Sequence, residues 1–567
     1  MNTRLFTRSV IVFLCVALVS SNALAAGRMP LRAKNGIVAS ASQIASDVGV
    51  DILRQGGNAV DAAVATAFAL AVTWPSAGNI GGGGFMVYHG EDGHATAFDF
   101  REKAPLAATQ DMYIGSDGRS NNLNHQSLLS VGVPGTVAGL YLAHQKLGHL
   151  PWAQLVDPAV RLARDGIPIS YALQSDFARA EDTWNRYPSS AKVFLKADAS
   201  LYEMGDTWVQ ADLAKTLERI RDNGKDGFYT GETAALLAQF MHDNGGLITE
   251  EDLALYEAVE REPIRGSYRG YEVISMPPPS SGGVAIVESL NILEGFDLAQ
   301  MGHNSAEYLH ILTEVMRRAF ADRAEHLGDP DFNPDMPISK LLDKDYADKL
   351  RASIDMDKAS VSDETAFSQA YESEQTTHFS VADSAGNMVS LTYTLERSYG
   401  SRIVAEGAGF LLNNEMGDFN PVPGVTNRYG QIGTPANIVA PQKRMLSSMS
   451  PTIIAKEGKP LMAIGSPGGR TIINTTLQII LNSIDHDMNI AEAIEAPRMH
   501  HQWLPDVTRF ESWGFSADTL SLYEQMGHEL TSRGSQGAAM GVFSDTAEGL
   551  YLGAADSRSP DGGVSGY

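Results

Sequence analysis

The sequence predicts an α+β fold in which β-sheets pack face to face between layers of helices. Residues 134–350 are mostly helical in pattern, residues after 376 form hairpins of alternating character, and further helices follow those hairpins. Strands with helices before and after them favour sheets whose outer faces are covered by helices. The 567-residue chain is 43% apolar and 20% charged, which is enough for a large buried core.

The first predicted elements are two helices within residues 42–71. Ile44, Val48 and Ile52 recur at a spacing of four and line one face of the first helix. Gly56-Gly57 separates it from the second, which is also amphipathic.

A glycine run at residues 78–84 follows these helices and leads to predicted strands at 85–88 and 95–100, the second ending at Arg101. Glycines in such a run indicate close approach of the backbone to a neighbouring element or a ligand. The run lacks the spacing and the lysine of a phosphate-binding loop, which argues against a nucleotide site.

The long helical region ends in an exposed loop. Residues 357–375 are mostly polar, small and acidic, so cleavage within this loop is sterically easy. The helices predicted before it are 135–147, 152–165, 211–223, 232–244, 284–293 and 305–327.

Two hairpins and three helices are predicted after residue 376. The hairpins turn at the glycine-containing segments 384–387 and 456–459. Their strands are 377–383 with 388–395 and 451–455 with 461–465, and the helices are 470–484, 490–496 and 517–526.

Residues 1–25 are predicted to be a secretory signal peptide. Arg4 and Arg8 precede an apolar stretch, and Ala23-Leu24-Ala25 is a small-residue cleavage site. The only cysteine, Cys15, lies inside this segment, so the mature chain has neither disulfides nor thiolate chemistry. The net charge of −25 argues against nucleic acid and anionic membranes as partners.

The sequence Gln375-Thr376-Thr377-His378 is the most informative segment. A threonine at the head of a strand is ordinary in an intact chain. If the bond between Gln375 and Thr376 breaks, however, Thr376 gains a free α-amine beside its own hydroxyl. Nucleophile and general base then belong to one residue. Thr377 is the competing candidate.

Several separated motifs together resemble the γ-glutamyltranspeptidase (glutathione hydrolase) family over essentially the whole mature chain. They are Phe100-Arg101-Glu102, Thr376 to Val381, Leu412 to Met416, Leu446 to Thr452 and Gly465 to Gly469. The resemblance implies a four-layer αββα N-terminal-nucleophile hydrolase fold. It also implies self-cleavage before Thr376, with residues 26–375 forming a large subunit and residues 376–567 a small subunit in one globular unit.

The resemblance also implies roles for individual residues. Thr376 would be the nucleophile, Thr394 would support it, and the backbone N–H groups of Gly468 and Gly469 would stabilise an oxyanion. The same glycines are equally well explained as a turn that caps the helix at 470–484.

A γ-glutamyl group presents a carboxylate and an ammonium on one carbon, so its binding needs a cation and hydroxyls on one side and carboxylates on the other. The matching residues are Arg101, Ser447 and Ser448 for the carboxylate and Glu415, Asp418 and Glu396 for the ammonium. Glu396 replaces the asparagine of some relatives, which leaves its role open. Asn427 and Tyr429 lie in a segment that resembles the lid loop of some members.

His378, His500 and His501 are expected to be structural, because an N-terminal threonine needs no histidine base and the spacing of a zinc site is absent. We therefore expect catalysis without a cofactor or metal.

The predicted activity is γ-glutamyl transfer and glutathione hydrolysis by a periplasmic or secreted heterodimer, with amino acids or dipeptides as acceptors. The alternatives are a cephalosporin (glutaryl-β-lactam) acylase of the same fold and a non-enzymatic exported binding protein. Glu415 and Asp418 disfavour the acylase, because a glutaryl chain has no α-ammonium.

Overall fold

The computed structural model describes residues 28–362, 376–424 and 434–567. The predicted signal peptide, Gln375, Asn427 and Tyr429 lie outside the described residues. Within the described ranges, no helix has the length and apolar character needed to cross a membrane.

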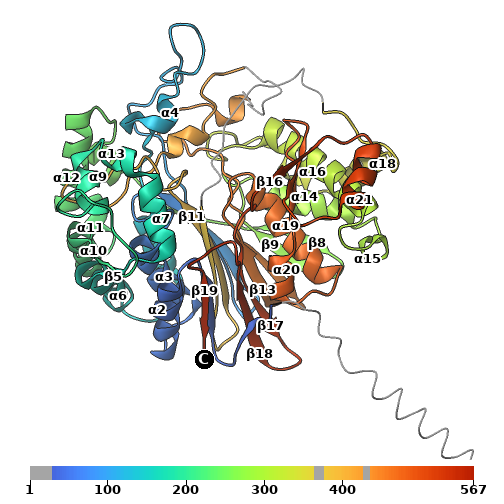
Figure 1. The fold of residues 1–567 in the computed structure, drawn as a ribbon, viewed down its shortest axis with the longest axis horizontal. Helices are drawn as coiled ribbons and strands as arrows, with labels where there is room; N and C mark the ends of the chain where they lie inside the picture. Colours follow the sequence, from blue (N-terminus) through green and yellow to red (C-terminus); the bar gives the residue numbers. More distant parts are fainter. Residues whose placement is uncertain (1–27, 363–375, 425–433) are drawn as a thin grey trace, which may run out of the picture.

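Two seven-stranded sheets form the centre of the molecule (Figure 1). The first has the strand order β1 (Leu31–Ala33), β18 (Leu550–Ala555), β17 (Met540–Asp545), β13 (Lys459–Gly465), β12 (Thr452–Lys456), β9 (Tyr271–Ser275) and β8 (Ile264–Tyr268). The second has the order β19 (Gly563–Gly566), β2 (Ile37–Ser40), β10 (Thr377–Ala382), β11 (Met388–Thr394), β3 (Gly83–His89), β4 (Ala95–Phe100) and β7 (Val259–Arg261). Strands β10 and β11 lie against β13 and β17, so the two sheets pack face to face.

A layer of helices covers the outer face of each sheet (Figure 1). The second sheet is covered by α2 (Gln43–Arg54), α3 (Ala59–Thr73) and α5 (Thr136–Leu147), with α6 (Trp152–Asp165), α10 (Ala211–Asn223) and α12 (Gly231–Asn244) further out. The first sheet is covered by α14 (Gly282–Leu293), α19 (Thr471–Ile484) and α20 (Ile490–Glu495), with α16 (Ala306–His326), α18 (Lys344–Ala352) and α21 (Ala517–Gln525) packed beside them. The predicted four-layer αββα architecture is confirmed.

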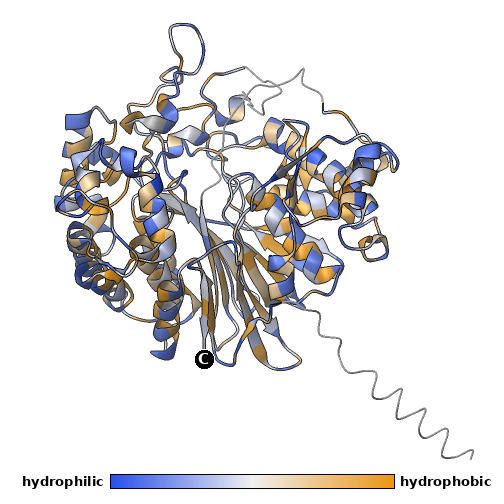
Figure 2. Ribbon diagram, viewed as in Figure 1, coloured by the Kyte–Doolittle hydropathy of each residue, from blue (hydrophilic) through white to orange (hydrophobic). Residues whose placement is uncertain are grey.

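Burial explains why these segments adopt these structures. Every residue of α3 is buried, and Asn58 accepts hydrogen bonds from the N–H groups of Val60 and Asp61 to cap its first turn. Strands β10 and β11 are also buried throughout, as expected for strands sandwiched between a second sheet and a helical layer. Apolar residues gather on the strands and on the helix faces turned toward them (Figure 2).

Several strands lie in segments where the sequence analysis predicted none. We expected residues 134–350 to be mostly helical, but β7, β8 and β9 lie there, and β16 (Leu530–Arg533) to β19 follow the last predicted helix. In β8, Gly266 interrupts the apolar pattern. It packs closely against α14, since a Cβ at this position would lie 2.5 Å from the side chain of Val287. Tertiary packing, which sequence periodicity does not report, therefore selects this strand.

Candidate active site

Thr376 lies one residue before β10, and the ladder with β11 determines what faces it. Thr377 pairs with Tyr393, so Thr394 stands opposite Thr376 one step further along. The hydroxyl of Thr376 donates a hydrogen bond to that of Thr394 at 3.4 Å, and Thr394 in turn accepts one from the N–H of Glu396 at 3.0 Å. Both threonines are buried.

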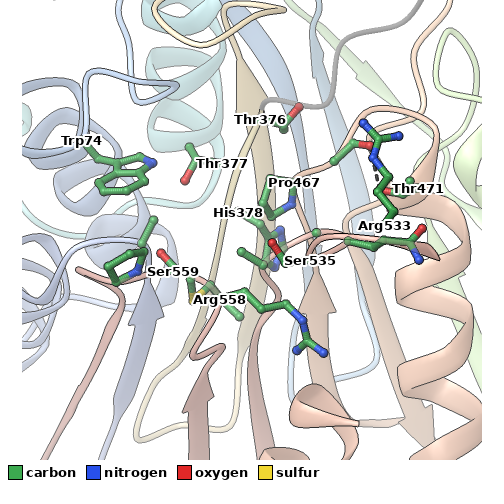
Figure 3. A pocket seen from close by; sticks show the side chains of 17 residues that line it. Trp74, Thr376, Thr377, His378, Pro467, Thr471, Arg533, Ser535, Arg558 and Ser559 are labelled. Carbon is green, nitrogen blue, oxygen red and sulfur yellow. Dashed lines mark hydrogen bonds between the residues drawn. The ribbon is translucent and has the colours of Figure 1, made fainter. Parts of the chain in front are cut away.

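Thr377 points away from this pair. In Figure 3 its hydroxyl is directed toward Trp74, whereas Thr376 stands at the upper end of the strand. The alternation of side chains along a strand produces this divergence. Thr376 therefore faces the charged residues described next, and Thr377 is not among the residues that line their cavity.

Arg101 is the centre of that charged cluster. It follows β4 directly, is fully buried, and makes ion pairs with Glu415 and Asp418. Its guanidinium also donates hydrogen bonds to the carbonyl oxygens of Met445 and Leu446 at 3.2 and 3.1 Å. The residues predicted to hold opposite ends of one substrate group thus contact each other directly.

The cluster contains more carboxylates than cations, and their protonation reflects this excess. Burial raises the pKa of Glu415 well above its ordinary value, opposed by Arg101 and reinforced by Glu102, Asp418 and Glu396. Burial also raises the pKa of Glu102 to about 7, although Arg101, with an Oε2–Nη1 distance of 3.6 Å, opposes the shift. Burial thus favours the protonated form of both carboxylates, and Arg101 opposes this in each case.

Glu396 is buried at the edge of the same cavity. Its backbone has a positive φ of 80°, which few non-glycine residues adopt. Its carboxylate accepts a hydrogen bond from the side-chain amide of Asn414, and its other oxygen lies 3.6 Å from Nδ1 of His125. Glu396 thus lines the cavity, as the ammonium-binding prediction requires.

Ser447 and Ser448 are held in place by Ser281 and Arg323, which come from the part of the chain before Thr376. The carbonyl of Ser447 accepts hydrogen bonds from the N–H and the hydroxyl of Ser281, at 2.8 and 2.7 Å. Arg323 of α16 donates to the hydroxyls of Ser448 and Ser281, at 2.9 and 2.8 Å. Both serines are buried and line the cavity with Arg101.

Gly468 and Gly469 form the turn before α19. Their φ angles of 133° and 57° are both positive, which favours glycine. The carbonyls of both glycines accept hydrogen bonds from the N–H groups of Thr471 and Ile472, each at 3.1 Å. The turn is therefore a helix start, as the simpler interpretation predicted, and it also places both glycines beside Thr376.

Two cavities meet at Thr376. The smaller, of about 20 Å³, is lined by Arg101, Thr376, Thr394, Glu396, Glu415, Asp418, Ser447, Ser448, Met449, Gly469 and Ile472. The larger, of about 200 Å³, also reaches Thr376 and is lined by Gly468, Thr377, Trp74, Arg533 and Ser559 among others (Figure 3). Apart from Gly468, the structure brings together in the smaller cavity every predicted site residue that it describes.

A model of the gamma-glutamyltranspeptidase family matches residues 45–566, nearly the whole described chain. The chain belongs to the γ-glutamyltranspeptidase family.

The glutathione hydrolase proenzyme of Escherichia coli (strain K12) is 51% identical over 542 residues, which cover 95% of this chain and 93% of that protein. The crystal structure of a cephalosporin acylase from Bacillus halodurans superposes with a TM-score of 0.84 at 28% identity and covers 97% of this chain and 98% of its own. The crystal structure of Helicobacter pylori γ-glutamyltranspeptidase is 44% identical with a TM-score of 0.56, covering 59% of this chain and 94% of that one.

The family match and the 51% identity confirm the predicted family, fold and type of activity. The chain is an enzyme of the glutathione hydrolase and γ-glutamyl transfer type. The alternative of a non-enzymatic binding protein is set aside. The acylase is a related branch of the same fold and is less similar in sequence than the glutathione hydrolase.

The three histidines singled out in the sequence all contact other side chains, and His378 also lines the larger cavity. His378 contacts the hydroxyls of Thr392 and Ser380 at 2.8 and 3.0 Å, and burial lowers its pKa to about 3. His500 contacts Asn474 at 2.7 Å, and His501 contacts Asp506 at 3.1 Å. None of the three lines the cavity that contains Arg101.

Glu102, Asn414 and Arg323 are the site residues that sequence reasoning missed. Glu102 and Asn414 lie inside motifs that were identified, so their neighbours in sequence were the available signal. Arg323 had no signal, because a charged residue on a 21-residue helix normally faces solvent.

Proposed function

We propose that Thr376 is both the residue that cleaves the precursor and the nucleophile of the mature γ-glutamyltransferase and glutathione hydrolase. The observation that supports this most is the position of its hydroxyl, which is bonded to Thr394 at the mouth of the cavity that contains Arg101. Attack of Oγ on the Gln375 carbonyl would break the peptide bond and form an ester. Water would then hydrolyse the ester and leave Thr376 with a free α-amine.

The same hydroxyl would next attack the γ-carbonyl of glutathione or another γ-glutamyl compound. The α-amine accepts the proton from Oγ and returns it to the leaving amine. The oxyanion is stabilised by the backbone N–H groups of Gly468 and Gly469, and Thr394 orients the nucleophile. Water resolves the γ-glutamyl ester as hydrolysis, and an amine resolves it as transfer.

Substrate recognition follows from the ion pairs of Arg101. The cavity of about 20 Å³ has room for little more than a water molecule, so a glutamyl group must separate Arg101 from Glu415 and Asp418. The substrate carboxylate then binds Arg101 with Ser447 and Ser448, and its ammonium binds the carboxylates, Glu396 included. Each buried charge keeps an opposite partner, which limits the desolvation cost.

The amine side of the reaction is assigned to the larger cavity. Leaving and accepting amines must approach Thr376 from the side opposite the glutamyl group, and the cavity of about 200 Å³ begins there. Its mixed polar and apolar lining suits an amino acid or a dipeptide. The charged and apolar regions of residues 1–25 support export of the enzyme to the periplasm or the medium.

The decisive experiment is the intact mass of the purified protein under denaturing conditions, for the wild type, Thr376→Ala and Thr377→Ala. We expect two fragments for the wild type, the smaller beginning at Thr376, and a single uncut chain without turnover for Thr376→Ala. Thr377→Ala is the matched control and should still be cleaved. Cleavage of Thr376→Ala would contradict self-processing by this hydroxyl.

Acyl specificity has its own test. The carboxylates Glu415 and Asp418 predict preference for γ-glutamyl over glutaryl anilide, because only the former carries an α-ammonium. Faster hydrolysis of the glutaryl compound would favour the acylase branch instead.

A further inference from the structure

A buried cluster separate from the Thr376 site brings together three side chains of types that commonly bind metal ions. His310 and Glu314 lie one turn apart on α16, and His528 lies in the loop between α21 and β16. Their ligand atoms all lie within 4.8 Å of one another, and the three side chains belong to buried residues. The catalytic mechanism uses none of them.

The hydrogen bonds of the two rings fix the tautomer of His310. Nε2 of His310 lies 2.8 Å from the carbonyl oxygen of Asp355, to which it must donate its proton. Nδ1 of His310 therefore presents a lone pair, and Nε2–H of His528 donates a hydrogen bond to it at 2.7 Å. A bound metal would take the place of that proton, which His528 would then carry on Nδ1. A histidine whose outer nitrogen donates to a backbone carbonyl is the usual arrangement of a metal ligand.

The ring of His528 is also held in place. It stacks on Tyr523 with ring centroids 4.2 Å apart and an interplanar angle of 7°. Tyr523 itself is fixed by hydrogen bonds to Thr313 and Thr508, at 2.8 and 2.6 Å. The second ligand is thus oriented by packing rather than by the cluster alone.

Glu314 supplies the carboxylate, but two arginines compete for it. Its oxygens accept hydrogen bonds from Arg318 at 2.7 Å, from Arg317 at 3.3 Å and from the N–H of Ser360 at 3.0 Å. Arg317 also forms an ion pair with Asp506, whose negative charge compensates the positive charge of Arg317 beside the cluster. These arginines weaken cation binding, so the two imidazoles must supply most of the affinity.

We propose that His310, Glu314 and His528 form a structural binding site for a divalent transition metal such as Zn²⁺. Two neutral imidazoles and one carboxylate suit zinc and its neighbours rather than Ca²⁺ or Mg²⁺, which prefer oxygen ligands. Tetrahedral zinc with Zn–N distances of about 2.0–2.1 Å needs the two ligand nitrogens about 3.3 Å apart. The two rings would therefore have to move slightly apart from their present separation of 2.7 Å.

The site would connect both subunits at the base of the cleavage segment. His310 and Glu314 belong to the predicted large subunit and His528 to the small one. Asp355 and Ser360 lie in the part of the chain that leads toward the predicted cleavage site, as does Ser362, whose N–H donates to Asp506 at 2.8 Å. A bound metal would therefore hold this part of the large subunit against the small subunit after cleavage, without taking part in catalysis.

The test is metal binding by the purified, processed enzyme after treatment with EDTA and removal of the chelator. We would titrate Zn²⁺ by calorimetry and Co²⁺ by visible absorption, for the wild type, His528→Gln and His326→Gln. His326 is the matched control, because it belongs to the second cluster with metal-ligand spacing among the described residues, together with Asp322 and Glu325. Thermal unfolding with and without Zn²⁺ gives an independent readout.

We expect about one equivalent of Zn²⁺ to bind the wild type and His326→Gln, with tetrahedral Co²⁺ bands and a higher unfolding temperature. In His528→Gln the affinity should fall by about tenfold or more. γ-Glutamyl hydrolysis should persist in that variant, which shows that it folds. Absence of binding to the wild type, equal binding by His528→Gln, or loss of binding in His326→Gln would overturn the proposal.

Discussion

At the scale of single residues, the main feature of the site is that buried carboxylates outnumber the one buried arginine they contact. Arg101 is surrounded by Glu102, Glu415 and Asp418, all of them buried. Such an arrangement costs stability unless protons or a substrate ammonium compensate the excess negative charge. Sequence analysis found three of these four residues through the family motifs, but it could not show that they contact each other.

Glu102 provides a prediction about pH. Its folded-state pKa of about 7 exceeds the ordinary 4.5 because of burial, so between these values the native state binds more protons than the unfolded chain. Stability from this group is therefore greatest below about pH 4.5 and is lost as the pH rises to about 7. Glu102→Gln keeps the neutral form at every pH.

Thermal unfolding between pH 4.5 and 8 should show the wild type losing stability relative to Glu102→Gln as the pH rises, with a constant difference above about pH 7. Parallel curves across the whole range would mean that Glu102 does not hold its proton in the native state.

At the scale of elements, the β10–β11 ladder and the turn before α19 position the chemistry. The antiparallel register alone puts Thr394 opposite Thr376, and both strands were predicted from their alternating pattern. The turn was predicted from its glycines, but its positive φ angles come from the structure. Strands such as β8 escaped prediction because packing against α14, and not local propensity, selects them.

Gly468→Ala should disrupt the turn. At φ 133° an alanine is strained, and its Cβ would lie 2.3 Å from Oγ1 of Thr471, which together cost about 1 kcal/mol or more. We expect slower self-cleavage and lower turnover, measured by fragment formation over time and by anilide hydrolysis.

Gly534→Ala is the control for that change. A Cβ at Gly534 would meet nothing within 4 Å, and the residue has no positive φ. Equal rates for both variants would show that the backbone of Gly468 does not position the oxyanion-binding groups.

At the scale of the whole molecule, the two predicted subunits are interleaved strand by strand. Strand β10 of the small subunit pairs with β2 of the large one, β11 pairs with β3, and β12 pairs with β9. Cleavage between residues 375 and 376 removes none of these ladders, and the core spans both pieces.

We therefore expect the cleaved fragments to co-elute in size-exclusion chromatography and to unfold in one calorimetric transition. The reason is that neither fragment contains a complete sheet, so neither can bury its apolar surface alone. Two separable fragments, or two independent transitions, would contradict this account.

The sequence by itself determined the amphipathic helices and the family, because these depend on local patterns and on motifs whose order is preserved along the chain. The nucleophile candidate and the export signal are predictions from the same kind of local pattern. Only the tertiary structure decided that Arg101 contacts Glu415 and Asp418, that Arg323 supports Ser448, and that His310, Glu314 and His528 meet. These contacts join residues more than a hundred positions apart, except for one helical turn in α16. Such proximity arises from the packing of sheets and helices, which leaves no trace in the spacing of residues along the chain.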